Sequence, residues 1–373
     1  MYRWLCLNTG TGKSTLIKFI IQALDINPEE DVCYIAFTGK AANVLTQKGC
    51  PNAITAHKLL YNAKQLPSGK YKFTPRKKLE HNYKIIVVDE VSMLPKQMWD
   101  LLLSHGVYIL ACGDPGQLPP IDPQTNNHIL DKPHIFLDEV MRQAQDSEII
   151  RLSMWIRENK SLNSFPCSKE QVQLFNLNEI SIGMFNWADQ ILCATNEKRI
   201  TINNIVRKSK GFGEEPELGD KIISLKNHWS VSSSSGGLAL TNGSIGTIQK
   251  ITKQQMFLPI HIYDRSVPVL NTDISLEDDN EDGFNDILID YKCLTTGTPA
   301  LTPHQIFLMK KRELMPPYDF AYAYAITTWK AQGSEWDKVL GFEEQFPYDK
   351  EIHKKFLYTM ITRASKKLVI VKK

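Results

Sequence analysis

The sequence predicts an α/β fold of two parallel-sheet domains, each interrupted by a small β insertion. Through the first 140 residues, short β-branched runs alternate with helical patterns, which is typical of βα units and a parallel sheet. A second alternation starts near Glu139, and between residues 245 and 316 it gives way to short β runs alone. We therefore expect one domain over 1–138 with a β-hairpin at 61–83, and another over 139–373 interrupted by an all-β insertion at 245–316.

The first domain is predicted to begin with a strand, a turn and a helix. YRWLCL (2–7) is long enough for one buried strand, and apolar residues recur at helical spacing from Thr15 onward. In open α/β sheets ligands bind at the carboxyl ends of the strands, so polar residues at several strand ends should converge on one crevice. The later strands predicted here are CYIAF (33–37), KIIVVDE (84–90) and VYILACGD (107–114).

The second domain is predicted to contain strands at QILCA (190–194), VLGF (339–342) and KLVIVK (367–372). Within its insertion, the acidic stretch LEDDNEDGFND (276–286) is most simply a solvated loop. SVSSSSGG (230–237) is likewise expected to be a flexible surface loop without chemistry.

Composition indicates an ordinary soluble globular protein, with 42% apolar and 23% charged residues. The net charge is only +3, so affinity for a polyanion must come from local patches. The seven cysteines form no C-x-x-C pair, which indicates a reducing compartment and no zinc site. Neither a signal peptide nor a stretch of about 18 apolar residues is present, so no membrane span is expected.

Residues 7–14 approximate a phosphate-binding loop of the pattern G-x-x-x-x-G-K-[ST]. In this motif backbone N–H groups at a helix start hold phosphates, the Lys reaches the outer phosphates and the hydroxyl binds Mg²⁺. Gly12, Lys13 and Ser14 match the end of the pattern, whereas Leu7 replaces its first glycine. Gly10 keeps the tip able to adopt positive φ. The competing interpretation is a glycine turn that caps an ordinary helix.

The run IIVV ends in Asp89 and Glu90, which predicts the second half of a nucleotide-hydrolysing site. The aspartate would hold Mg²⁺, usually through water, and the glutamate would orient and polarise the attacking water. The next strand ends in GDPGQLPPI (113–121), where Gln117 is placed to reach a γ-phosphate and two prolines stiffen the loop. A solvated strand end is the alternative for Asp89 and Glu90 taken alone, but the phosphate loop upstream argues against it.

With these residues in place, the sequence resembles the superfamily 1 helicases of the RecD-like, 5′→3′ branch, which includes the phage Dda-like enzymes. The resemblance runs almost from end to end, and its segments follow the family order. These segments are NTGTGKST (8–15), AFTGKAANVL (36–45), TAHKLL (55–60), VVDEVSML (87–94), CGDPGQLPPI (112–121), LDEVMRQ (137–143), CATNEKRITINNIVR (193–207), AYAITTWKAQGSEWDKV (323–339) and LYTMITRASKKLVIV (357–371).

The resemblance implies two RecA-like P-loop lobes that hydrolyse ATP with Mg²⁺ in the cleft between them. It also implies an SH3-like β insertion. The segment LTNGSIGTIQKI (240–251) resembles the entry to that insertion, where glycines would permit a tight turn between short strands. Arginines from the second lobe would stabilise charge on the γ-phosphate when the cleft closes. The expected catalytic residues are Lys13, Glu90, Gln117, Arg142 and Arg363. The expected nucleotide-binding residues are Gly10, Thr11, Gly12, Lys13, Ser14, Thr15, Gln332 and Gly333, with the metal at Ser14 and Asp89.

The resemblance further implies that single-stranded DNA is the track of the motor. A motor that tolerates every sequence should contact the backbone through hydroxyls, amides and a few cations. Trp329 stands where many relatives have His, and for this residue both base stacking and core packing are open. The expected DNA contacts are Thr38, Lys40, Thr55, His57, Asn196, Thr327 and Lys330.

The basic hairpin KQLPSGKYKFTPRKK (64–78) resembles the pin that splits duplex DNA in this branch, and a solvated charged turn is the alternative. We therefore expect single-stranded DNA and its junctions with duplex as partners. We also expect no membrane association, a monomer, and a location in the cytoplasm of a bacterial or phage-infected cell.

The sequence departs from the family before the phosphate loop, where relatives have a further segment with a glutamine that recognises adenine. Three explanations are open: a truncated or misassigned start, a nucleotide site with poor base selectivity, or a decayed ATPase that only binds DNA. The presence of the catalytic side chains favours the first two.

Overall fold

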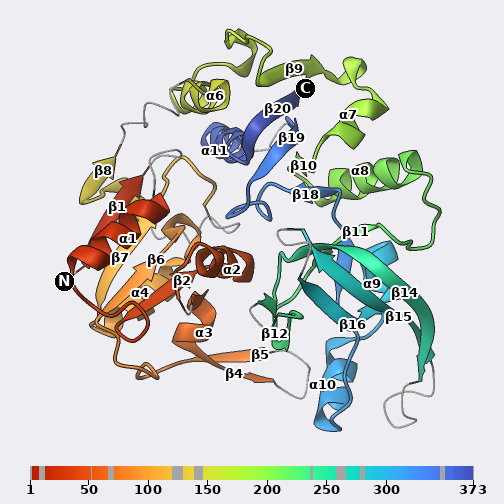
Figure 1. Cartoon of the computed structure of the whole chain (residues 1–373), viewed down its shortest axis with the longest axis horizontal. Helices are drawn as coiled ribbons and strands as arrows, with labels where there is room; N and C mark the ends of the chain where they lie inside the picture. The colour runs from red at the N-terminus through yellow and green to blue at the C-terminus, as the bar shows by residue number, and fades with distance from the viewer. Residues whose placement is uncertain are drawn as a thin grey trace. The chain divides into compact units, whose positions relative to one another are not determined.

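The computed structural model describes residues 2–7, 13–51, 53–65, 71–119, 129–137, 146–235, 238–257, 266–277, 282–344 and 349–372 (Figure 1). Its contacts divide the chain into two compact units. The first comprises Met1–Leu60, Arg76–Arg199 and Ala325–Lys373, and the second comprises Tyr61–Pro75 and Ile200–Tyr324. The first unit contains two parallel sheets and the second an antiparallel sheet, so the predicted α/β class with β insertions is confirmed.

The first parallel sheet has the strand order β3-β2-β6-β7-β1-β8. β1 pairs with β7 on one side and β8 on the other, so the predicted strand YRWLCL lies inside the sheet. β8 was not predicted, because three residues are too few to show a periodic pattern. The strands are β1 (Tyr2–Leu7), β2 (Val32–Ala36), β3 (Ile54–Thr55), β6 (Ile85–Val88), β7 (Tyr108–Gly113) and β8 (Ile135–Leu137).

Helices cover this sheet through their apolar faces. Ile17 and Ile21 of α1 (Lys13–Ala23) and Leu45 of α2 (Gly39–Gln47) share one core cluster with the strand residues Val87 and Leu110. Burial of each such side chain contributes about 1.5–3 kcal/mol, which is why helical spacing of apolar residues predicts α1 correctly. The remaining helical elements here are α3 (Ala56–Leu60), η1 (Val91–Met93), α4 (Lys96–Ser104) and η3 (Ile129–Asp131).

The second parallel sheet has the strand order β18-β10-β19-β20-β9. Three of its strands are predicted, whereas β9 carries polar residues and β18 is only three residues long. Its strands are β9 (Val172–Asn176), β10 (Gln190–Cys193), β18 (Ala325–Thr327), β19 (Trp336–Phe342) and β20 (Ala364–Lys372). Its helical elements are α6 (Glu148–Arg157), η4 (Leu162–Ser164), η5 (Leu177–Glu179), α7 (Ile182–Trp187), α8 (Asn196–Ser209) and α11 (Lys350–Ile361).

The second unit is built around an antiparallel sheet of order β16-β15-β14-β11-β17. This sheet is wider than the predicted 245–316, because β11 and β17 are short strands that have no alternating pattern of their own. The strands of this unit are β4 (Tyr61–Gln65), β5 (Tyr71–Pro75), β11 (Lys221–Ser224), β12 (His228–Ser232), β13 (Ala239–Leu240), β14 (Ile245–Phe257), β15 (Ser266–Leu276), β16 (Gly283–Asp290) and β17 (Phe320–Tyr322). Its helices are α9 (Tyr291–Thr296) and α10 (Pro303–Lys311). β4 and β5 form the antiparallel hairpin expected from the basic segment.

Two glycines shape the entry to β14. Gly243 has φ of 96°, a left-handed conformation that residues with a Cβ rarely adopt. A Cβ on Gly246 would lie 2.4 Å from the carbonyl oxygen of Ser275 on the neighbouring strand β15. The N-G-x-x-G spacing therefore serves a turn at its first glycine and a close strand approach at its second.

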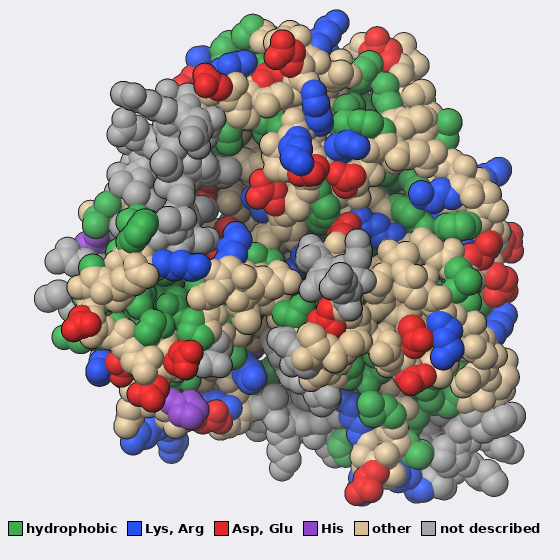
Figure 2. Space-filling model, in the orientation of Figure 1, with side chains coloured by type: hydrophobic (Ala, Val, Ile, Leu, Met, Phe, Trp, Pro, Cys, Tyr) green, Lys and Arg blue, Asp and Glu red, His purple; other side chains and the backbone are tan. Residues whose placement is uncertain are grey.

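The surface carries both signs of charge. On the face drawn in Figure 2, Lys and Arg side chains are interspersed with Asp and Glu side chains, in keeping with the small net charge of +3. Within the described residues, no helix has the length and apolar character needed to cross a membrane.

Candidate functional site

The candidate phosphate loop connects β1 to α1. A strand that ends at Leu7 and a helix that begins at Lys13 flank it, as the motif requires. Gly10, Thr11 and Gly12 lie outside the described residues, as does Arg142. For Lys13, Ser14 and Thr15 the structure describes the backbone in the first turn of α1, so their side-chain roles stay predictions.

Asp89 and Glu90 follow β6 at the carboxyl edge of the first sheet, where β6, β7 and β1 are neighbours. The backbone N–H of Asp89 donates to the carbonyl of Ile35 at 2.9 Å, which fixes the strand end against β2. Glu90 has φ of 50° and ψ of 46°, a left-handed conformation that costs an L-residue about 1–2 kcal/mol. A strained backbone at a half-buried carboxylate is typical of a functional position.

The loop after β7, residues 114–119, is buried and internally hydrogen-bonded. Asp114 is fully buried, and its Oδ1 accepts from the backbone N–H of Gly116 at 2.9 Å. Gln117 is 2% exposed, and its N–H donates to the carbonyl of Asp114 at 3.1 Å. The side-chain Oε1 of Gln117 has no hydrogen-bond partner among the described residues. A buried acceptor in this state is costly unless a ligand satisfies it.

Residues of the second sheet's helices hold this loop. Tyr358 of α11 donates its hydroxyl to Asp114 Oδ2 at 2.6 Å, and Arg157 of α6 lies 3.6 Å from Asp114 Oδ1. The backbone N–H of Leu118 donates to Thr359 Oγ1 at 2.9 Å. The loop that carries Gln117 is therefore bonded to the second lobe through both its carboxylate and its backbone.

The loop after β18, residues 328–334, contacts the first lobe as well. Gln332 is 2% exposed and donates through Nε2 to the carbonyl of Leu118 at 2.9 Å. Trp329 donates through Nε1 to the carbonyl of Pro119 at 3.3 Å, which favours packing over base stacking for its ring. Gly333 has φ of 77°, and a Cβ there would lie 3.1 Å from Ala41 of α2.

Hydrogen bonds inside this loop make it a compact turn. The backbone N–H groups of Lys330 and Ala331 donate to the carbonyl of Thr327 at 2.9 and 3.1 Å. Ser334 donates to Ala331 at 3.0 Å. Lys330 and Gln332 therefore belong to the same hydrogen-bonded turn.

Arg363 lies at the end of α11 and is 6% exposed. Its Nε donates to the carbonyl of Thr359 at 3.1 Å, one Nη to the carbonyl of Ser334 at 3.0 Å, and the other to Thr362 Oγ1 at 3.1 Å. All three acceptors are neutral, and no carboxylate among the described residues lies within ion-pair distance. The positive charge is held in place without being neutralised by these groups, which suits an anionic ligand.

In the first lobe, the candidate DNA residues differ in exposure. Thr38 caps α2 by accepting from Ala41 N at 3.2 Å. Lys40 is 6% exposed, with its ammonium 5.3 Å from the Trp336 ring of β19, and Thr55 is 2% exposed. Neither side chain is therefore presented to solvent in this conformation. His57 is exposed on α3, where partial desolvation lowers the pKa of its ring.

In the second lobe, three candidates lie at the carboxyl ends of β10 and β18, which pair through Cys193 and Thr327. Asn196 is the first residue of α8, Thr327 ends β18 and Lys330 follows it. Burial and the nearby Arg199 lower the pKa of Lys330 to about 8. The structure brings Asn196, Thr327 and Lys330 to one edge of the sheet.

Two known protein families match this chain. Residues 6–174 match an AAA domain, and residues 322–371 match a UvrD-like helicase C-terminal domain. The ATP-dependent RecD2 DNA helicase of Deinococcus radiodurans is 35% identical over 149 residues, which cover 38% of this chain and 20% of that protein. The ATP-dependent DNA helicase dda of Enterobacteria phage T4 is 30% identical over 121 residues, which cover 31% of this chain and 28% of that protein. Over these segments the chain is similar to DNA helicases of the RecD/Dda-like branch of superfamily 1.

The matched segments thus span well under half the length of these relatives. Solved structures with a similar fold cover nearly the whole length of this chain. Pif1 helicase from Candida albicans has a TM-score of 0.58 at 17% identity, covering 100% of this chain and 90% of that one. Bacteroides Pif1 bound to single-stranded DNA has a TM-score of 0.58 at 16% identity, covering 99% and 88%. The two parallel sheets are therefore RecA-like, as expected.

Several residues near the predicted site were given no role by sequence reasoning. Asp114, Tyr358 and Arg157 form the buried cluster described above, and Arg199 lies beside Lys330. The signal for Asp114 was present in GDPGQLPPI, where an aspartate precedes the glutamine by three residues. Its partners are distant in sequence, and nothing in the sequence pairs them.

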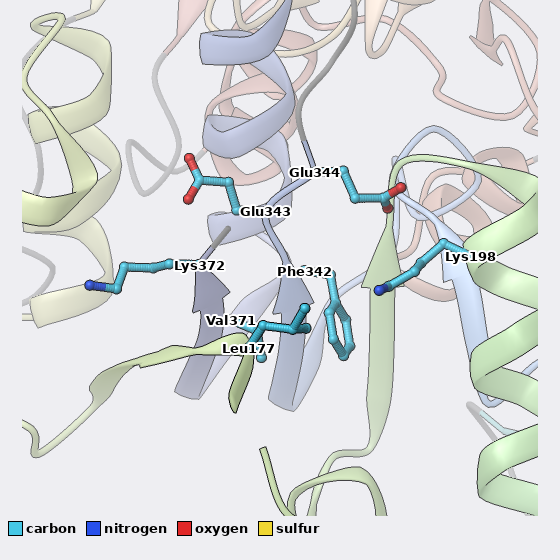
Figure 3. Close-up of a pocket in the computed structure, with 7 residues that line it drawn as sticks. All are labelled: Leu177, Lys198, Phe342, Glu343, Glu344, Val371 and Lys372. Carbon is cyan, nitrogen blue, oxygen red and sulfur yellow. The ribbon is translucent and has the colours of Figure 1, made fainter. Parts of the chain in front are cut away.

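A cavity of about 280 Å³ opens at the carboxyl ends of β19 and β20 (Figure 3). Phe342, Val371 and Leu177 line its apolar part. Glu344 at its rim accepts from Ala194 N at 2.5 Å and from the Thr195 hydroxyl at 2.8 Å, just before α8. Glu344 thus fixes the segment between β10 and α8.

Proposed function

We propose that this chain is an ATP-driven motor that translocates 5′→3′ on single-stranded DNA and unwinds duplex DNA. ATP would be hydrolysed between the two RecA-like lobes. Two relatives, RecD2 and dda, are ATP-dependent DNA helicases, which supports this proposal. The solved structure of Bacteroides Pif1 in complex with ADP-AlF3 and single-stranded DNA also supports it.

One observation carries the proposal: within the part of the chain that the structure describes, the buried guanidinium of Arg363 is bonded to neutral acceptors only. Burying a cation without a counter-charge costs on the order of several kcal/mol. A γ-phosphate supplies the missing charge, and more of it develops in the transition state of its transfer. The unpartnered oxygens of Gln117 and Gln332, both 2% exposed, favour a polar ligand in the same region.

The other nucleotide residues divide the work by their chemistry. Backbone amides of Gly10, Thr11 and Gly12 would hold phosphates, and Lys13 would reach the outer ones. Glu90 would orient the attacking water and Gln117 would report the γ-phosphate, while Arg142 and Arg363 would stabilise the developing charge.

The donor set fits Mg²⁺. Among the described residues no three His, Cys, Asp or Glu side chains gather around a common point. Mg²⁺ is bound in nucleotide sites by one or two protein oxygens, the phosphates and water, and Ser14 and Asp89 supply such oxygens. When bound, the ion would neutralise phosphate charge and align the phosphates.

The DNA strand would run along the carboxyl edge of the second lobe past Asn196, Thr327 and Lys330. Thr38 and His57 would continue the path in the first lobe. The β4–β5 hairpin would act as the pin at a junction with duplex. A monomer in the cytoplasm remains our working proposal for its state and location.

ATP hydrolysis with and without single-stranded DNA tests the motor, with Lys13→Ala as the site control. We expect DNA to stimulate hydrolysis and Lys13→Ala to abolish it. Duplexes with 5′ or 3′ tails then test direction, and the 5′-tailed substrate should unwind. DNA binding that is indifferent to ATP and to Lys13→Ala would instead support a DNA-binding protein with a decayed ATPase, the alternative raised by Leu7. A preference for 3′ tails would reverse the assigned direction.

A further inference from the structure

Two cationic residues follow the paired carboxyl ends of β10 and β18. The strands pair in register through Cys193 and Thr327. Thr328 then donates to the carbonyl of Cys193 through both its N–H, at 2.9 Å, and its hydroxyl, at 3.3 Å. These bonds fix the loop that carries Lys330 against the start of α8, which carries Arg199.

The guanidinium of Arg199 is oriented by its own helix. Its Nε donates to Asn196 Oδ1 at 3.2 Å, one turn earlier on α8. With Nε directed to Asn196, the two Nη groups form the edge that pairs with planar or tetrahedral oxyanions. Asn196 therefore holds the fork of Arg199 in a set direction.

Lys330 follows the other strand end, and the charge of Arg199 acts on its ammonium. Its ammonium makes no ion pair or hydrogen bond with any described residue, although the side chain is half-buried. Burial, and after it the positive charge of Arg199, lower the pKa of Lys330 to about 8. Two like charges brought together in a partly desolvated place repel each other, and an anion between them removes that cost.

We propose that Arg199 and Lys330 together bind one backbone phosphate of the single-stranded DNA, with Asn196 as the residue that positions Arg199. This inference rests on the proposed function and adds Arg199 to the DNA contacts. Such a contact reads no base, as a motor on any sequence requires.

The start of α8 is capped within the chain, because Thr195 Oγ1 accepts from the backbone N–H of Lys198 at 3.3 Å. Glu344 accepts from Ala194 N and from the Thr195 hydroxyl, which occupies the polar groups that precede the helix. A phosphate at this edge would therefore bind to Arg199 and Lys330 rather than to the helix start.

Lys198 offers a matched control one residue away. Its ammonium lies 5.1 Å from the ring of Phe342 and lines the cavity at the ends of β19 and β20 (Figure 3). Lys198→Ala removes the same charge from the same helix turn but leaves the Arg199–Lys330 pair intact.

The test is fluorescence anisotropy with a labelled oligo-dT at several salt concentrations, on wild type, Arg199→Ala, Lys330→Ala, Arg199→Lys and Lys198→Ala. A hydrogen-bonded charge pair predicts a loss of affinity of about tenfold or more for Arg199→Ala. The slope of log affinity against log salt should become shallower by about 0.7, the value for one phosphate on a single strand. Arg199→Lys keeps the positive charge but lacks the two Nη groups of the guanidinium, so its affinity for oligo-dT should lie between those of wild type and Arg199→Ala. Circular dichroism and thermal melting confirm that each variant is folded.

Wild-type affinity and salt slope in folded Arg199→Ala would overturn the inference while leaving the motor proposal in place. So would an equal loss in Lys198→Ala, since a general charge effect would then explain the result. A wild-type protein that binds no oligo-dT would overturn the proposed function, and this inference with it. Thermal stabilisation by inorganic phosphate that Arg199→Ala abolishes, alongside unchanged oligo-dT binding, would assign the pair to free phosphate and also overturn the inference.

Discussion

Replacing Tyr358 with Phe should loosen the loop that carries Gln117. The substitution deletes one hydroxyl, which donates at 2.6 Å to a carboxylate oxygen of the fully buried Asp114. Asp114 keeps the N–H of Gly116 at 2.9 Å and Arg157 at 3.6 Å, so its charge is not left without partners. The ring of Phe fills the same space.

Hydrogen bonds to charged groups contribute about 1.5–3 kcal/mol, which sets the expected loss of unfolding free energy for Tyr358→Phe. For a unit of this size, about 2 kcal/mol corresponds to a fall of roughly 4–8 °C in melting temperature. Tyr108→Phe is the matched control, because Tyr108 is 61% exposed and should shift the melting temperature by less than about 1 °C.

A double-mutant cycle with Asp114→Asn separates this bond from other effects. Denaturant titration of the wild type, both single variants and the double variant should give a coupling energy of about 1.5–3 kcal/mol. Because the bond positions the Gln117 loop, Tyr358→Phe should also lower the DNA-stimulated kcat of ATP hydrolysis more than it raises KM. A coupling energy near zero, or a kcat unchanged despite the lost stability, would refute the reasoning.

Three further predictions follow from charges that the structure buries. Arg363→Lys keeps a cation but loses the guanidinium group that bonds to three neutral oxygens. The kcat of ATP hydrolysis should therefore fall by about 10³-fold in a steady-state assay. A fall of less than about tenfold would argue against contact of Arg363 with the γ-phosphate. The pKa of Lys330 is about 8 in the free protein, and a bound phosphate would raise it. DNA affinity should therefore be constant below about pH 7 and decline as pH rises above 8, and Lys330→Ala should flatten this profile in anisotropy titrations. Arg207 and Asp220 form a buried bidentate pair at 2.9 and 3.0 Å, so Arg207→Ala should destabilise the second unit by about 3–5 kcal/mol in denaturant titrations, and a loss under 1 kcal/mol would contradict it.

The sequence predicts the parts of the fold that have a local signal. Strands such as β2, β6 and β7 are continuous apolar runs, and α1 shows apolar residues at helical spacing. The three-residue strands β8 and β18 have no such signal, because their place depends on pairing with residues far along the chain. The basic hairpin was predictable because Pro67-Ser68-Gly69 separates two strand-like runs.

The site shows the same division. Motif spacing predicts Glu90, Gln117 and Arg363 as site residues, because their residue types are tied to their chemistry. It did not identify the bond between Asp114 and Tyr358, which lie 244 positions apart. Nor did it show that Lys40 packs over Trp336, since lysine is a residue type that is mostly exposed and only the folded contact shows its burial.

The turn after β18 links the positions of Lys330 and Gln332. Lys330 and Gln332 are two positions apart in one turn closed by hydrogen bonds to Thr327. A shift of Gln332, which is bonded to Leu118 of the opposite lobe, must carry Lys330 with it. With the proposed roles, Gln332 at the nucleotide and Lys330 at the DNA, this single turn would couple hydrolysis to DNA contact without intermediate residues.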